Sequence, residues 1–153
     1  MRIFNHLSSP DKVQDNIKNM AQMVGKYIHE KSENLDEYFK AIGVPYIPRK
    51  MMIASNPTVE VTTSEDGQWS ITITTLFRTV SYKFNLGEEY EEHMPGATIK
   101  SITTIEGDKL ITQCISPDNT HTTRVYSFSE DGLIISYKHE ESGKEAIRHF
   151  KRV

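Results

Sequence analysis

Much of the chain alternates between hydrophobic and polar residues with a period of two. The alternation is clearest in residues 69–74 and 80–86. Because a period of two places one set of side chains on each face of a strand, these segments predict half-buried antiparallel strands.

Turn dipeptides separate these segments at short intervals. They are Asp66-Gly67, Pro95-Gly96, Glu106-Gly107, Asp131-Gly132 and Ser142-Gly143. Such pairs supply the positive φ that tight hairpins need. No helical pattern intervenes after about residue 58, so the sequence predicts a β-meander that is closed into a barrel or folded as a sandwich. The acidic pairs Glu88-Glu89 and Glu91-Glu92 predict an exposed edge that discourages aggregation.

The first third of the chain predicts an opening strand over residues 25–31, followed by two helices. Asn34 is a helix cap, and Gly43 is a stop signal. Between them, four apolar residues fall at i, i+3, i+4 and i+7: Leu35, Tyr38, Phe39 and Ile42. This face covers either packed core or a ligand. A second helix is predicted over about 46–55.

Residues 1–22 lie outside this plan, and we expect them to form an extension to a barrel domain at residues 23–153. Ser9-Pro10-Asp11 is a helix start, and Val13, Ile17 and Met20 would share one face. Isolated helices of this length are marginal in water, so a flexible segment and a short amphipathic helix both fit.

Composition and charge exclude several classes of protein. Eighteen basic and 21 acidic residues give a net charge of −3 with no basic block, so nucleic-acid binding is not expected. The single cysteine, Cys114, excludes a disulfide framework and a cysteine-rich zinc site. The histidines are scattered, and we expect no metal or cofactor. The N-terminus is a poor secretory signal and no apolar run reaches the ~18 residues of a membrane span, so we expect a soluble cytoplasmic protein.

A series of segments from Met23 onward carries a resemblance to a known family. They are Gly25-Lys26-Tyr27, 34–40, Ile42-Gly43-Val44, Asn56-Pro57-Thr58, Phe77-Arg78, 84–90, Lys100-Ser101-Ile102 and 146–152. In order and spacing they resemble the intracellular lipid-binding proteins, which include the fatty-acid-binding and cellular retinoid-binding proteins. His29, Leu35 and Phe39 depart from the usual residue classes. The resemblance implies an all-β, ten-stranded antiparallel up-and-down β-barrel (calycin/lipocalin-like), capped by a helix-turn-helix lid, with one lipid in an internal cavity.

The resemblance also implies a polar end to the site. Arg148 matches the arginine of the family's Arg-x-Tyr carboxylate motif, and Phe150 replaces the tyrosine. Without the resemblance, Arg148 would be an ordinary surface arginine. The family's second basic position falls on Tyr126, or on Arg124 if the alignment has a gap of two. In one interpretation, Tyr126 supplies the hydroxyl that Phe150 lacks. In the other, Arg124 lies outside at the barrel end.

The lid implies a second group of ligand contacts: Tyr38, Phe39, Ile42 and Phe77. By resemblance, Arg49, Lys50, Met51 and Met52 frame the entrance. Cations beside apolar groups suit fatty-acid entry and transient contact with an anionic membrane, although the charges alone also fit a solvated helix face.

We therefore expect a monomeric, non-enzymatic carrier of long-chain fatty acids or related lipids. The Phe150 departure also admits a retinoid or a neutral lipid as the ligand. A second hypothesis is an interaction module that recruits a partner or a membrane through residues 1–22. An enzyme is a remote third, because the chain has no recognisable catalytic triad or metal set.

Overall fold

The computed structural model describes residues 9–94 and 96–153. The first eight residues of the expected extension, and Pro95 in one expected turn, lie outside the described residues. Three helices and ten strands follow in chain order. The helices are α1 (Pro10–Met23), α2 (Leu35–Ala41) and α3 (Tyr46–Ala54). The strands are β1 (Gly25–Glu33), β2 (Thr58–Thr63), β3 (Trp69–Thr74), β4 (Thr79–Phe84), β5 (Glu89–Met94), β6 (Ala97–Glu106), β7 (Lys109–Ile115), β8 (His121–Phe128), β9 (Gly132–His139) and β10 (Glu145–Arg152).

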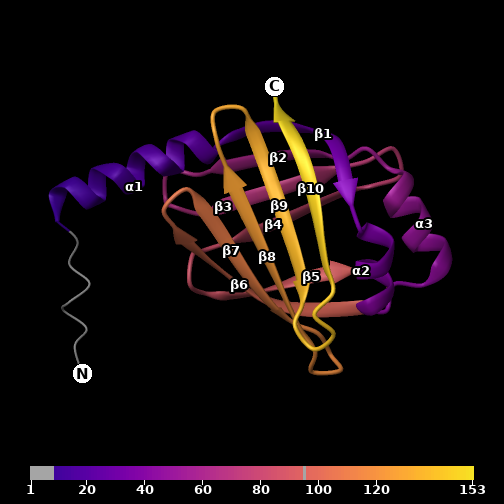
Figure 1. Ribbon diagram of the computed structural model, residues 1–153. Helices are drawn as coiled ribbons and strands as arrows, with labels where there is room; N and C mark the ends of the chain where they lie inside the picture. The colour runs from indigo at the N-terminus through magenta and orange to yellow at the C-terminus, as the bar shows by residue number, and fades with distance from the viewer. Residues whose placement is uncertain (1–8, 95) are drawn as a thin grey trace.

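The strands form one antiparallel sheet that curls into a barrel (Figure 1). The order β4-β3-β2-β1-β10-β9-β8-β7-β6-β5 is an up-and-down meander closed by the pairing of the first strand with the last. The two end strands of the sheet, β4 and β5, also contact each other. The predicted ten-stranded up-and-down barrel is confirmed.

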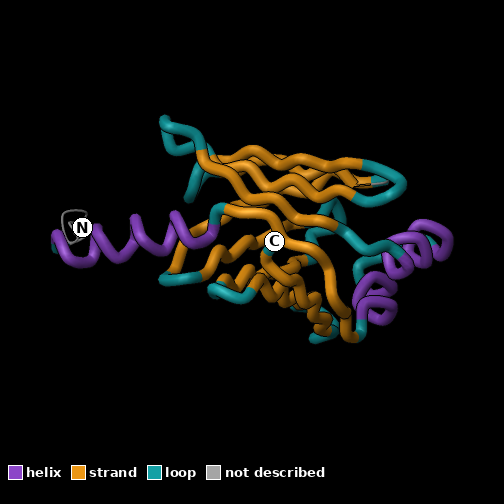
Figure 2. Tube along the Cα trace, turned by 90° about the horizontal axis from the view of Figure 1, so that it is seen from above, coloured by secondary structure: helices purple, strands orange, loops and turns teal. Residues whose placement is uncertain are grey.

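The helices lie at opposite ends of the barrel. Helices α2 and α3 form a helix-turn-helix at one end, and α1 extends from the other end (Figures 1 and 2). Residues 25–33 lead from the C-terminus of α1 along the barrel wall to the start of α2, so the chain crosses the barrel before it forms the lid.

The first lid helix begins after the predicted cap residue, but the side chain of that residue does not cap it. Asn34 is the N-cap residue of α2, but its side chain makes no capping hydrogen bond and its φ is 59°. Instead, Asn34 Nδ2 donates a 2.7 Å hydrogen bond to the Glu145 carbonyl oxygen, at the start of β10. The asparagine therefore ties the lid to the barrel.

The buried hydrophobic side chains form two clusters. The main cluster comprises Met23, Tyr27, Val59, Val61, Trp69, Ile71, Phe84, Leu110, Tyr126, Phe128, Leu133, Ile135 and Phe150. The lid cluster comprises Leu35, Tyr38, Phe39 and Ala146. Tyr137 packs against both clusters, so it marks the zone where they meet.

Helix α1 is attached to the barrel at its C-terminal end. Met23 is fully buried, and the Tyr27 hydroxyl donates a 2.7 Å hydrogen bond to its carbonyl oxygen. The Arg152 guanidinium donates to the carbonyl oxygens of Gln22 and Val24. These bonds satisfy carbonyl groups that the end of a helix leaves free. Within the described part of the chain, we find no helix with the length and hydropathy to cross a membrane.

Candidate functional site

Arg148 lies inside the barrel, between the two hydrophobic clusters. On β10 it shares a face with Ala146, of the lid cluster, and Phe150, of the main cluster, and it is 8% exposed. The guanidinium Nη2 donates a 2.9 Å hydrogen bond to the Met52 carbonyl oxygen on α3. Its Nε is buried and has no hydrogen-bond partner. Arg148 is thus bonded directly to the lid, and its Nε–H is a hydrogen-bond donor without an acceptor in the protein.

Arg124 also points inward, where it forms a bidentate ion pair with Glu92 of β5. Arg124 Nη1 donates to Glu92 Oε1 at 2.9 Å, and Nη2 donates to Oε2. The Glu92 side chain is fully buried and that of Arg124 is 16% exposed. The position of Arg124 outside the barrel end, one of the two sequence interpretations, is wrong.

Glu92 was not predicted as part of the site, and its expected place on an exposed acidic edge is wrong. Glu89 and Glu91 are exposed, whereas Tyr90 and Glu92 alternate with them toward the interior. The Tyr90 hydroxyl donates to Glu92 Oε2 at 3.3 Å. The signal that could have found Glu92 is its even spacing from Tyr90, since a period of two assigns both to one face.

The electrostatics keep both members of this pair charged. Burial opposes ionisation of Glu92, but the adjacent Arg124 guanidinium and its hydrogen bonds bring the pKa of the carboxyl below its usual range. Burial raises the pKa of Tyr137, whereas Arg148 and Arg124 both act to lower it. Tyr137 pairs with Arg124 across β8 and β9, and Arg148 pairs with Ile135 two residues along the same strand. Both guanidiniums therefore flank one tyrosine.

The interior near the ion pair also holds a chain of hydroxyl groups. The Tyr90 and Thr103 hydroxyls are 2.7 Å apart, and so are those of Thr103 and Thr112. Tyr126 is buried, and its ring centroid lies 6.0 Å from the Arg124 guanidinium carbon. This zone combines hydroxyl groups with the ion pair, and Tyr126 links it to the main cluster.

The remaining predicted residues fall in three places. Tyr38 and Phe39 are buried in the lid cluster, against which Ile42 packs, and the rings of Tyr38 and Tyr137 are 5.4 Å apart. Phe150 packs in the main cluster. Phe77 lies apart from all of these, 60% exposed in the turn between β3 and β4.

The chemistry open to this site is the binding of an anion. Among the described residues, the buried side-chain polar atoms without a partner are Trp69 Nε1, Arg124 Nε and Arg148 Nε, and all three are donors. A carboxylate is an acceptor only, and its bonds to guanidinium groups are among the stronger hydrogen bonds in proteins. An anionic head group placed between the two arginines would supply the acceptors that the protein lacks.

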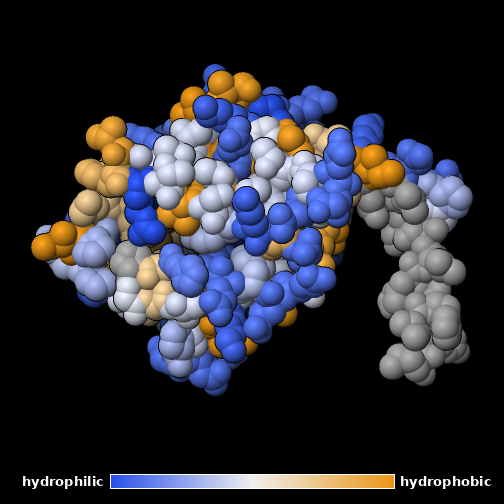
Figure 3. All heavy atoms as spheres, turned by 180° about the vertical axis from the view of Figure 1, so that it is seen from behind, coloured by the Kyte–Doolittle hydropathy of each residue, from blue (hydrophilic) through white to orange (hydrophobic). Residues whose placement is uncertain are grey.

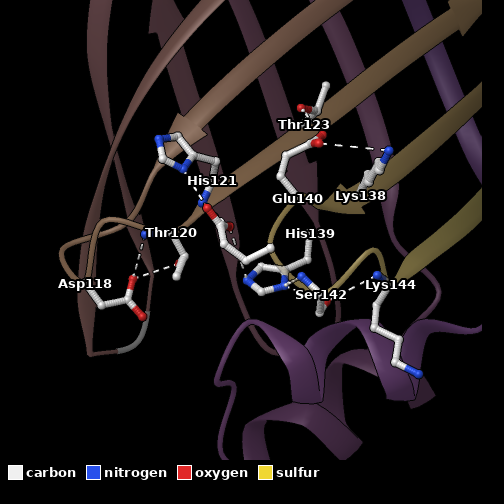
Figure 4. A network of polar contacts seen from close by, with 10 residues as sticks. Asp118, Thr120, His121, Thr123, Lys138, His139, Glu140, Ser142 and Lys144 are labelled. Atoms are coloured by element: carbon white, nitrogen blue, oxygen red, sulfur yellow. Dashed lines mark hydrogen bonds and ion pairs between the residues drawn. The ribbon is translucent and has the colours of Figure 1, made fainter.

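A second polar network lies at the end of the barrel beside the lid helices (Figure 4). Glu141, in the turn between β9 and β10, accepts bonds of 2.7 Å from the backbone N–H of His121 and lies 2.7 Å from His121 Nδ1. These bonds lower the pKa of Glu141 to about 2. Its Oε1 is also 3.8 Å from His139 Nε2. The bonds between His121 and Glu141 link β8 to the β9–β10 turn. Within the described ranges, no group of three or more His, Cys, Asp or Glu side chains could hold a metal ion.

A closed meander barrel, a two-helix lid and cations on the inner wall define the class of the protein as a small-ligand-binding barrel. Residues 24–147 match the profile of the lipocalin / cytosolic fatty-acid binding protein family, and the chain belongs to this family.

Individual relatives agree with this assignment. A fatty acid-binding protein of Tyrophagus putrescentiae is 34% identical over 134 residues, which cover 87% of this chain and 99% of the relative. Sodium/calcium exchanger regulatory protein 1 of Doryteuthis pealeii is 42% identical over 101 residues, covering 65% of this chain and 76% of the relative. The Schistosoma mansoni fatty acid binding protein, solved in complex with arachidonic acid, superposes with a TM-score of 0.82 at 25% identity, over 88% of this chain and 98% of that one.

Proposed function

We propose that the protein is a non-enzymatic carrier that holds a long-chain fatty acid inside the barrel and transports it in the cytoplasm. The observation that carries this proposal is the buried Arg148 guanidinium, whose Nε has no partner and which lies on β10 between the apolar residues Ala146 and Phe150. Membership of a family described as cytosolic and fatty-acid binding, and relatives named as fatty acid-binding proteins, support it.

In this proposal the head group binds between Arg148 and Arg124, and the tail packs against the apolar side chains of the barrel. A charge-assisted hydrogen bond contributes about 1.5–3 kcal/mol, and each buried methylene adds ~0.8 kcal/mol. Tyr126 lies next to Arg124 and lines the same region. Phe150 offers no hydroxyl, so the arginines would carry most of the polar recognition.

A neutral lipid fits these observations less well. Its head group would leave the Arg148 charge buried and uncompensated, and a buried charge without an opposite partner is costly. A retinoid with a carboxylate would satisfy the arginine, so the experiment below includes one.

The test is binding of palmitate, retinoic acid and retinol to delipidated protein, measured by displacement of a fluorescent fatty acid. We expect palmitate to bind at micromolar concentration or below, and Arg148→Gln to weaken it at least tenfold. Lys151→Gln, on the exposed side of the same strand, should bind as the wild type does. No binding of palmitate to the wild type would contradict the fatty-acid proposal, and unchanged affinity in Arg148→Gln would move the head-group site elsewhere.

We further infer that the lid end makes transient contact with anionic membranes. Five large apolar side chains of α3 and the β3–β4 turn are exposed there: Tyr46, Ile47, Met51, Leu76 and Phe77. Hydrophobic atoms gather at this end of the molecule in the space-filling view (Figure 3). Lys50 and Arg78 lie beside them in the sequence, and the combination of exposed apolar groups with cations suits an anionic lipid surface.

A further inference from the structure

We propose that Glu92 sets the charge of the ligand: because it neutralises Arg124, the part of the barrel interior near the lid keeps a single uncompensated cation, Arg148, and selects lipids with one negative charge over dianionic lipids. This inference rests on the proposed function, since it concerns the same interior site.

The first support is that the Arg124–Glu92 pair is complete without a ligand. Both oxygens of the Glu92 carboxylate are bonded by Arg124, and Tyr90 donates a further bond to Oε2. The carboxylate is fully buried, so no solvent competes with Arg124 for its two oxygens. The charge of Arg124 is thus already balanced within the protein, although its Nε–H remains open as a donor.

The second support is the count of charges on the inner wall. Arg152 also lies on the inward face of β10, but at the α1 end of the barrel, where its guanidinium donates to the carbonyl oxygens of Gln22 and Val24. Away from that end, the Asp, Glu, Lys and Arg side chains of the described strands that reach the interior are Arg124, Arg148 and Glu92. Two positive charges and one negative charge leave one positive charge. Among the described residues, Arg148 bonds to the Met52 carbonyl oxygen and to the Tyr137 side chain, and neither carries a negative charge.

The chemical consequence is a preference that depends on ligand charge and not only on shape. A carboxylate brings one negative charge and makes the site neutral. An alkyl phosphate carries close to two negative charges above its second pKa of about 6, so one of them would be buried without a partner. Removing the Glu92 charge frees the second guanidinium, and a dianion then becomes the better match.

The experiment compares palmitate with hexadecyl phosphate at pH 8 by displacement of a fluorescent fatty acid from the full chain. For the wild type, we expect palmitate to bind at least tenfold more tightly. In Glu92→Gln, the preference for palmitate over hexadecyl phosphate should fall below threefold or reverse. Glu91→Gln removes the same charge from the exposed face of the same strand, and it should keep the wild-type ratio.

The double variant Glu92→Gln/Arg124→Gln restores an interior with one cation, and we expect it to recover the preference for palmitate. A ratio that is equal in the wild type and Glu92→Gln would overturn the inference, as would a wild type without preference. Failure of the wild type to bind palmitate at all would instead reject the proposed function.

A measurement on the wild type alone tests the inference even if the Glu92 variants do not fold. Calorimetry of hexadecyl phosphate binding at pH 8, in buffers with different ionisation enthalpies, should show uptake of close to one proton, because the interior accepts only the monoanion. Binding without proton uptake would overturn the inference without any substitution.

Discussion

Gly132 is the glycine of the barrel wall that has the least room for a side chain. A Cβ at this position would lie 2.1 Å from the Phe150 carbonyl oxygen, which belongs to the backbone of β10 and cannot rotate away. We expect Gly132→Ala to lower the free energy of unfolding by about 1–3 kcal/mol, the usual cost of overpacking. Chemical denaturation measures this, with Lys138→Ala on the exposed face of β9 as the control. A loss no larger than in the control would mean that β9 and β10 separate easily at this point.

At the scale of single residues, the alternation along a strand predicted which side chains point inward. It could not predict an ion pair between residues that are distant along the chain. Arg148 alternates with Ile147 and His149, and its predicted shared face with Ala146 and Phe150 agrees with the burial of all three. Glu92 lies in a run of acidic residues, which is typical of solvent exposure. What keeps it inside is Arg124, 32 residues away, and no local pattern contains that contact.

At the scale of elements, the strands and lid helices could be predicted because both are marked by local periodicity and turn residues. The second lid helix was expected over about 46–55 and spans Tyr46–Ala54. The role of Asn34 could not be predicted, because its side chain bonds the Glu145 carbonyl 111 residues later. From the sequence alone, the Asn34 side chain is expected to bond the N–H groups at the start of α2. In the folded barrel it bonds the Glu145 carbonyl oxygen instead.

The link between β8 and the β9–β10 turn leads to a prediction about acid stability. Hydrogen bonds from His121 lower the pKa of Glu141 from 4.5 to about 2. A depressed pKa in the folded state stabilises the fold above the unfolded value of 4.5, and this contribution is lost as the pH falls toward 2. We expect Glu141→Gln to be less stable than the wild type at pH 5–7, with the difference disappearing near pH 2.

Chemical denaturation at a series of pH values between 7 and 2 tests this prediction. Glu140→Gln, the adjacent turn residue, controls for the loss of one negative charge at the same end of the barrel. A constant difference between Glu141→Gln and the wild type across the whole range would show that the effect of Glu141 is not tied to its ionisation.

At the scale of the whole molecule, the barrel has two functionally different ends. At one end, α1 is anchored by buried Met23 and by the bonds from Arg152. At the other, the lid presents exposed apolar residues and contacts the interior through the bond from Arg148 to the Met52 carbonyl oxygen. The hydrogen bond gives the lid direct contact with the cation that we assign to the head group. A surface that binds the lid from outside is therefore in a position to influence ligand release.

This arrangement predicts that fatty-acid transfer to vesicles occurs on contact with the membrane. The rate of transfer of a fluorescent fatty acid should increase with vesicle concentration, be higher for vesicles containing phosphatidylserine, and fall as salt screens the cations of the lid end. We expect Phe77→Ser to slow the transfer severalfold without changing the affinity for the fatty acid, because Phe77 is exposed and lies away from the buried guanidiniums. Ile134→Ser removes an exposed apolar side chain from the barrel wall instead, and it should transfer at the wild-type rate. A rate that is independent of vesicle concentration and unchanged in Phe77→Ser would mean that the ligand dissociates into water first, and that the apolar lid surface serves some other contact.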